Sequence, residues 1–168
     1  SDSDGSSLSS ELLNGTMTSG GTTFQDTTKV DVNSTATSGG ANTLKDTTQT
    51  WTTNQWAAKP VYIVSGTGAG QTNVVVSNTS DELTLSGAWT TPIDNTSVYT
   101  IGGWVPNELI GCVVSTWEGS GALQKRRVIA NTSYAITVDA AWADATNNTT
   151  EYSVAAIEQF AEEYWDSN

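Results

Sequence analysis

The sequence contains no histidine and a single cysteine, Cys112, and these two shortages exclude several kinds of site. Without histidine there is no Ser-His-Asp triad, no Cys-His pair and no histidine-ligated metal. One cysteine excludes an intramolecular disulfide and a zinc site built from four cysteines. No apolar run approaches the roughly 20 residues of a membrane-spanning helix, and residues 1–4 lack the basic start of a signal peptide. We therefore expect no membrane partner.

Basic residues are also scarce. Six Lys and Arg face 18 Asp and Glu, which gives a formal net charge of −12. A surface this negative repels nucleic acid and anionic membranes. Only 14% of the residues are charged, so the negative net charge comes from a shortage of Lys and Arg rather than from a high content of charged residues. This composition favours a protein kept soluble in concentrated salt, where the Debye length falls to about 3 Å and self-repulsion is screened. An ordinary acidic protein is the alternative.

What the sequence does have is an internal repeat. Shifted by 53 residues, the chain matches itself without a gap over a window of about 50 residues. Trp51 aligns with Trp104, Trp89 aligns with Trp142, and residues 78–80 recur identically 53 positions later. Each copy contains short alternating apolar runs separated by turn residues, a pattern typical of antiparallel strands. The repeated tryptophans are expected to pack in the core, since large aromatic residues dominate small β cores.

We therefore predict an all-β protein made of two tandem small antiparallel β-modules, barrel-like or sandwich-like. The expected boundaries are 39–102 for the first module and 103–155 for the second. Residues 1–38, rich in Ser, Thr and Gly, are expected to form an extended arm. Within the arm, residues 23–28 resemble residues 43–48, as a partial copy of the opening strand of a module would. Such an arm would lie on a neighbour or complete a sheet by strand addition.

Residues 156–168 predict a short amphipathic helix. Ile157, Phe160 and Tyr164 share one stripe of such a helix, and the opposite face is acidic. Because a helix of this length is marginal alone, its apolar stripe is expected to dock on the modules or on another subunit.

No pattern in the sequence predicts a catalytic, cofactor-binding or metal-binding site. The glycines of residues 66–70 resemble a phosphate loop, but a predicted strand follows where such a loop needs a helix. A hairpin turn is the better interpretation. The acidic residues do not recur between the two copies, and no general acid–base pair is apparent. Cys112 has no basic neighbour that would activate it. We expect a protein that is not an enzyme and needs no cofactor.

Candidate contact residues come from three features. Two tryptophans have no tryptophan counterpart in the other copy, and Trp is enriched at binding hot spots. Three consecutive cations supply half of the positive charge and alternate in facing if they lie on a strand. They form a solvated sheet face or, as a sharper hypothesis, a docking site for an acidic neighbour such as the helix of an adjacent copy. The candidates are Trp56, Trp117, Lys125, Arg126, Arg127, Ile157, Phe160 and Tyr164.

Residues 42–48, 51–56 and 61–71 resemble a β-repeat found in structural proteins of tailed viruses. The resemblance continues over residues 77–99, covering 42–101 well and 104–154 more weakly. It departs from the usual repeat at Pro60, which is expected at a strand start or sheet edge. Together with the acidic composition, the resemblance implies a non-enzymatic virion protein of a tailed virus of halophilic archaea.

The arm and the helix expected at the two ends favour a head decoration or turret protein, assembled as a symmetric oligomer on the capsid. Its partners would be other copies, the major capsid protein or other virion proteins. A head–tail connector or tail protein is the alternative within this class. An adhesion module that binds a host-surface glycan or S-layer through exposed tryptophans is the alternative from another class.

Overall fold

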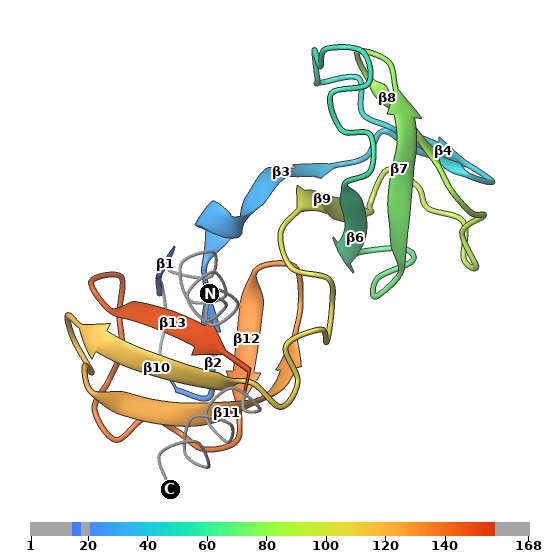
Figure 1. Cartoon of the computed structure of the whole chain (residues 1–168). Coiled ribbons are helices and arrows are strands. Elements are labelled where there is room, and N and C mark those ends of the chain that lie inside the picture. Colours follow the sequence, from blue (N-terminus) through green and yellow to red (C-terminus); the bar gives the residue numbers. More distant parts are fainter. Residues whose placement is uncertain (1–14, 18–20, 157–168) are drawn as a thin grey trace, which may run out of the picture. The chain divides into compact units, whose positions relative to one another are not determined.

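The computed structural model describes residues 15–17 and 21–156 of the chain. The expected all-β class is confirmed: these residues form antiparallel strands and one 3-10 turn, η1 (Thr27–Lys29) (Figure 1). The strands belong to two sheets, one of seven and one of six strands, and the chain divides into two units accordingly. Of the predicted C-terminal helix, residues 157–168 lie outside the described residues.

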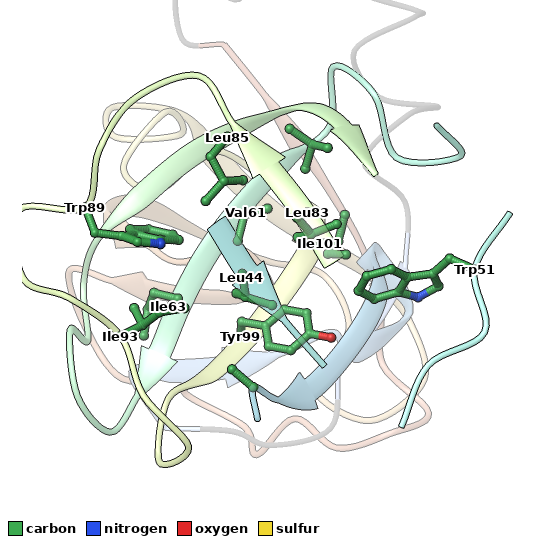
Figure 2. Packing of buried hydrophobic residues seen from close by; sticks show 12 residues of the cluster. Leu44, Trp51, Val61, Ile63, Leu83, Leu85, Trp89, Ile93, Tyr99 and Ile101 are labelled. Carbon is green, nitrogen blue, oxygen red and sulfur yellow. The ribbon is translucent and has the colours of Figure 1, made fainter. Parts of the chain in front are cut away.

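The first module comprises residues 29–105. Burial alternates along residues 60–65 and 82–85, so that every second side chain there points into a common core. In the view of Figure 2, Trp89 and Trp51 flank this cluster of aliphatic side chains. The strands, in sheet order, are β3 (Val30–Thr35), β9 (Val98–Gly102), β6 (Pro60–Ser65), β7 (Thr72–Asn78), β8 (Glu82–Leu85), β5 (Thr43–Lys45) and β4 (Ser38–Gly40).

The second module draws on two parts of the chain, the segment before residue 29 and the segment from residue 106 onward. Figure 1 shows this in the colours of the sequence: blue strands lie in the same sheet as orange and red ones. The strands, in sheet order, are β1 (Gly15–Thr16), β13 (Glu151–Ala155), β10 (Val113–Glu118), β11 (Gln124–Asn131), β12 (Ala135–Val138) and β2 (Thr23–Gln25).

The predicted repeat appears strand by strand. β10, β12 and β13 begin and end 53 residues after β6, β8 and β9. The register agrees as well: Val61 faces Ile101 across β6 and β9, and Val114 faces Val154 across β10 and β13. The two copies of the repeat therefore form the same set of paired strands, and the repeated tryptophans are buried, as predicted.

The opening strands of the second module come from the segment expected to be an arm. β1 pairs with β13 at Gly15 and Tyr152, as β3 pairs with β9 at Ser34 and Tyr99. β2 pairs with β12 as β5 pairs with β8. The described part of the segment before residue 29 thus completes a sheet by strand addition, within its own chain. The remainder of the expected arm belongs to the first module, as β3 and β4, so the boundaries of both modules differ from those predicted.

The sequence explains this arrangement. With a gap at one position, Ala41, residues 14–28 match residues 33–48 at ten of fifteen aligned positions, a longer match than the one noted above. The order along the chain is therefore nested. The second module begins, the entire first module follows, and the second module is then completed.

Repeated asparagines hold the turns that precede β6 and β10. Asn54 N donates to Asn78 O at 2.8 Å, Asn78 N donates back to Asn54 Oδ1 at 3.2 Å, and Trp56 N donates to Asn78 Oδ1 at 2.9 Å. Asn107 and Asn131 form the same reciprocal pair. Asn54 and Asn107 have φ of 60° and 65°, a left-handed conformation that Asn tolerates better than most residues. The recurrence of these asparagines therefore has a structural cause.

A buried Tyr–Asp hydrogen bond joins the opening and closing strands of each module. Tyr99 Oη donates to Asp46 Oδ2, and Tyr152 Oη donates to Asp26 Oδ2, both at 2.6 Å. All four side chains are at most 1% exposed. Each Asp also accepts a hydrogen bond from the backbone N–H of the Thr two residues later, at 3.1 Å. The equivalent bond in both modules identifies it as part of the shared framework.

Burial raises the pKa of the Asp46 carboxyl, but hydrogen bonds, above all from Thr48 and then Tyr99, outweigh burial and hold this pKa at about 2. Burial, and next the hydrogen bond to Asp46, raise the pKa of Tyr99 above its ordinary value. The hydroxyl therefore stays a donor and the carboxylate stays charged across the ordinary pH range.

Replacing Tyr99 with Phe removes one donor to this charged, buried carboxylate. We expect the free energy of unfolding of the first module to fall by about 1.5–3 kcal/mol, the usual contribution of a hydrogen bond to a charged group. Urea unfolding followed by tryptophan fluorescence measures it. Tyr134→Phe is the control, because within the part of the chain that the structure describes the Tyr134 hydroxyl makes no hydrogen bond. Equal stabilities of the two variants would contradict the role given to Tyr99.

Acid should weaken the first module through Asp46. Because the folded pKa of about 2 lies below the usual 3.8, this carboxylate contributes stability that is complete above pH 3.8 and is lost as the pH falls through 2. Unfolding measured from pH 5 to pH 2 should show this loss, and the loss should be smaller in Asp46→Asn. An equally steep loss in the variant would assign the acid sensitivity to other groups.

Candidate interaction surface

The three consecutive cations lie on β11, and their side chains alternate as predicted. Lys125 and Arg127 are exposed, whereas Arg126 is half-buried. Across the pairing with β10, Val113 faces Arg127 and Ser115 faces Lys125. Residues directly opposite each other in a sheet project to the same side. Lys125 and Arg127 therefore share one face of the second module with the outward residues of β10.

We call this surface the outer face of the second module. It also carries large apolar side chains: Trp117 is 46% exposed and Ile129 is 50% exposed. Leu123, in the turn before β11, is 86% exposed. Exposed aromatic and aliphatic groups beside cations are typical of binding surfaces. The outer face is formed by Val113, Ser115, Trp117, Lys125, Arg127 and Ile129.

An open hollow of about 430 Å³ borders this face. Its lining residues are Val113, Lys125, Arg126, Arg127, Asp139 and Ala140. The Asp139 carboxylate accepts a hydrogen bond from the Arg127 backbone N–H at 3.2 Å. Among the residues that the structure describes, the Arg127 guanidinium makes no ion pair. The hollow thus combines two exposed cations with one carboxylate at its margin.

Arg126 has a different role from its two neighbours. Its guanidinium carbon lies 5.2 Å from the centroid of the Trp142 ring, and Nε and Nη2 donate to Ala141 O at 3.1 and 2.8 Å. In the first module the equivalent residue is Asn73, whose Nδ2 donates to Gly87 O at 2.8 Å. Both residues thus hold the loop that follows the third strand of the repeat. Arg126 stabilises the second module, although it also borders the hollow.

The two tryptophans singled out in the sequence differ in their surroundings. Trp56 packs against the core of the first module, with its ring edge-on to Trp51 at 6.4 Å between centroids. Its Nε1 is buried. Trp117 remains nearly half exposed on β10. Of this pair, only Trp117 offers a large aromatic surface. Ile157, Phe160 and Tyr164 lie outside the described residues.

The corresponding face of the first module has a different chemistry. Thr72 and Val74 stand where the second module has Lys125 and Arg127, and Val64 stands where it has Trp117. The equivalents of Val113, Ser115 and Ile129 are likewise uncharged. Duplication has kept the interior and the turns of the module, whereas the outward residues have diverged in charge and in size.

Sequence reasoning missed the contribution of Ile129 and Asp139 to this surface. Ile129 could have been found, because it continues the alternation of Lys125 and Arg127 along the strand. Asp139 could not, because its position depends on how β12 ends beside β11.

No group of three or more Cys, Asp or Glu side chains within residues 15–17 and 21–156 is placed to hold a metal ion. The same residues include no helix with the length and apolar character needed to cross a membrane. Cys112 is partly buried in the turn before β10.

Comparison of the chain with protein-family models, with curated proteins and with solved structures finds no match.

The different roles of neighbouring cations can be separated by substitution. Arg126→Ala removes the contact with Trp142, two hydrogen bonds to Ala141 O and one to Lys125 O, so we expect the second module to lose about 1–2 kcal/mol of unfolding free energy. Lys125→Ala changes an exposed position and should alter stability by less than about 0.5 kcal/mol. Chemical denaturation of both variants tests this, and the assignment is wrong if they are equally stable.

Proposed function

We propose that this protein is a non-enzymatic structural protein of the virion of a tailed virus of halophilic archaea, and that it is a head decoration or turret protein. The observation that carries the proposal is the contrast between the shared interiors of the two modules and their divergent outward faces. The resemblance of residues 42–101 to a β-repeat of tailed-virus structural proteins supports the viral class. The net charge of −12 supports an environment of concentrated salt.

The contrast between the faces supports binding rather than catalysis. Both modules keep the same paired strands, Tyr–Asp bonds and asparagine pairs, which are requirements of folding. No such requirement of folding applies to Lys125, Arg127 and Trp117. These side chains point away from the core, and the equivalent residues of the first module are Thr or Val. Trp and Arg are the residues most enriched at energetic centres of interfaces. The outer face of the second module is therefore the surface we assign to a partner.

Electrostatics favour an acidic partner. The rest of the chain is strongly negative. In concentrated salt the repulsion between copies is screened beyond about 3 Å, so direct contact between a local cationic surface and an acidic one favours particular partners. Lys125 and Arg127 provide such a surface. Acidic regions of another copy, of the major capsid protein or of other virion proteins fit it. The same contacts would serve a head–tail connector or tail protein, which is the alternative position in the virion.

Adhesion to a host-surface glycan or S-layer is the second candidate function. The exposure of Trp117 favours it, because an aromatic face can stack on a ligand ring. Trp56 does not add to this candidate, since it packs against the core. Specific binding to a glycan array that is lost in Trp117→Ala would favour adhesion over a structural role.

The structural role predicts assembly through the outer face. In molar salt, the double variant Lys125→Ser with Arg127→Ser should still form oligomers, but more weakly than the unmodified chain. We expect its dissociation constant to be at least about tenfold higher, which corresponds to a loss of roughly 1.4 kcal/mol of binding free energy. Light scattering and native mass spectrometry measure this. Thr72→Ser with Val74→Ser changes the equivalent positions of the first module and should assemble like the unmodified chain.

If the double variant at Lys125 and Arg127 assembles like the unmodified chain, the outer face does not take part in assembly. Location of the chain in virions by electron cryomicroscopy tests the viral role directly, and purified virions that lack the chain would overturn that role.

A further inference from the structure

We propose that the outer face of the second module binds the same face of a second copy of the chain, in a two-fold symmetric dimer. In this dimer the acidic end of each face, Glu118 and Glu151, meets the cationic end of the other face, Arg127. This inference rests on the assembly role proposed above, and it names the partner and the contact.

Two carboxylates stand side by side at the acidic end. Glu118 on β10 is directly opposite Glu151 on β13. Because Glu151 alternates with the buried Tyr152 along β13, both carboxylates project to the outer face. Like charges directly opposite each other destabilise a sheet. Within the part of the chain that the structure describes, neither carboxylate makes an ion pair, so a cation from a partner would relieve their repulsion.

The cationic end lies at the opposite end of the same hairpin. Arg127 faces Val113, which is the first residue of β10, whereas Glu118 is the last. Since a strand rises about 3.4 Å per residue, the two ends are roughly 15 Å apart. The Arg127 guanidinium forms no ion pair with any residue that the structure describes. The hollow that Val113 and Arg127 help to line gives a partner's side chains access to this cation.

Both ends distinguish the second module from the first. The first module has Ser65 and Val98 at the positions of the acidic end, and these two residues also face each other. It has Val74 at the position of Arg127. The shared fold therefore requires neither the two carboxylates nor the cation. The opposite charges occur together in one module only, and there they lie on a single face.

A two-fold rotation brings these opposite charges together. With the axis perpendicular to the face and midway between its ends, the acidic end of one copy lies over the cationic end of the other. A two-fold contact is reciprocal, so both Arg127 side chains meet a pair of carboxylates. Direct contact is needed, because concentrated salt screens attraction beyond about 3 Å. Lys125, which lies between the two ends, has no part in this contact.

Apolar side chains at the acidic end would be covered in the same dimer. Trp117, beside Glu118, is about half exposed, and Leu123, in the turn of the hairpin, is almost fully exposed. Leu123 has a φ of 66°, a left-handed conformation, and the equivalent residue of the first module is Gly70. A leucine in this conformation is unfavourable in the free chain. Burial of its side chain against a second copy would offset that cost.

Exchange of charges between the two ends tests the dimer. Arg127→Glu brings only carboxylates together at the contact, and the double variant Glu118→Lys with Glu151→Lys brings only cations together. Each variant alone should have a dimer dissociation constant at least about tenfold higher than the unmodified chain. Mixed in equal amounts, the two variants should form a dimer with one copy of each, because every contact then joins opposite charges. Native mass spectrometry in molar ammonium acetate measures both results.

Matched changes in the first module serve as controls. Val74→Glu, and the double variant Ser65→Lys with Val98→Lys, should leave the dimer intact. Far-ultraviolet circular dichroism verifies that every variant is folded.

Leu123→Gly gives an independent measurement. In dilute, dissociated protein it should raise the unfolding temperature, because glycine adopts the left-handed conformation without strain. In concentrated protein it should nevertheless raise the dissociation constant of the dimer several-fold. Dimers as tight as those of the unmodified chain would contradict the burial of this end of the hairpin.

The proposal is wrong if the mixture of the two charge variants stays dissociated, or if the unmodified chain remains a monomer in molar salt. A third outcome separates it from the proposed function. If Lys125→Ser with Arg127→Ser weakens assembly but Glu118→Lys with Glu151→Lys does not, the face binds another acidic surface, so the two-fold dimer is wrong and the assembly role stands. Conversely, a chain that forms this dimer but is absent from virions would defeat the proposed function alone.

Discussion

Burying a carboxylate costs several kcal/mol unless its oxygens are hydrogen-bonded, and this requirement fixes the topology of both modules. Asp26 and Asp46 follow the short strands β2 and β5. Neighbouring residues donate to one oxygen of each carboxylate, and a tyrosine from the last strand of the module donates to the other. The ends of β2 and β5 must therefore lie beside the last strands of their modules, β13 and β9, around the same core. Short strands of three residues have little stability of their own, so the bond also fixes where they pair.

Duplication separates the residues that make the fold from those that make a surface. The positions kept in both copies have identifiable physical duties: Asn54 and Asn107 adopt left-handed conformations, and Gly66 and Gly119 leave no room for a side chain beside Thr96 O and Thr149 O. The outward positions have no such duties and have diverged. An internal repeat thus acts as a comparison within one chain, and the differences on the outer face stand out against a constant interior.

Strand positions could be predicted because alternating burial and turn residues are local features that occur twice. That Lys125 and Arg127 share one face of the strand could be predicted as well, because side chains alternate between the two faces along a strand. The nested order could not be predicted from local pattern, since Asp26 and Tyr152 are 126 residues apart and the segment before residue 29 has the composition of an arm. The longer match of residues 14–28 to residues 33–48 was the overlooked signal. The burial of Trp56 depends on the asparagine-held turn, which periodicity does not describe.

The nested order also bears on how the chain folds. At the ends of the first module, Val30 pairs with Gly102, so a folded first module brings its entry and exit together. The path from β2 to β10 then behaves as a connection of roughly 16 residues rather than roughly 88, which lowers the entropic cost of closing the second sheet by about 1.5 kcal/mol. During synthesis the inner module is complete before β10 emerges. We therefore expect the first module to fold first and, by holding its two ends together, to bring the two parts of the second module into reach of each other. The second module should complete its folding only afterwards.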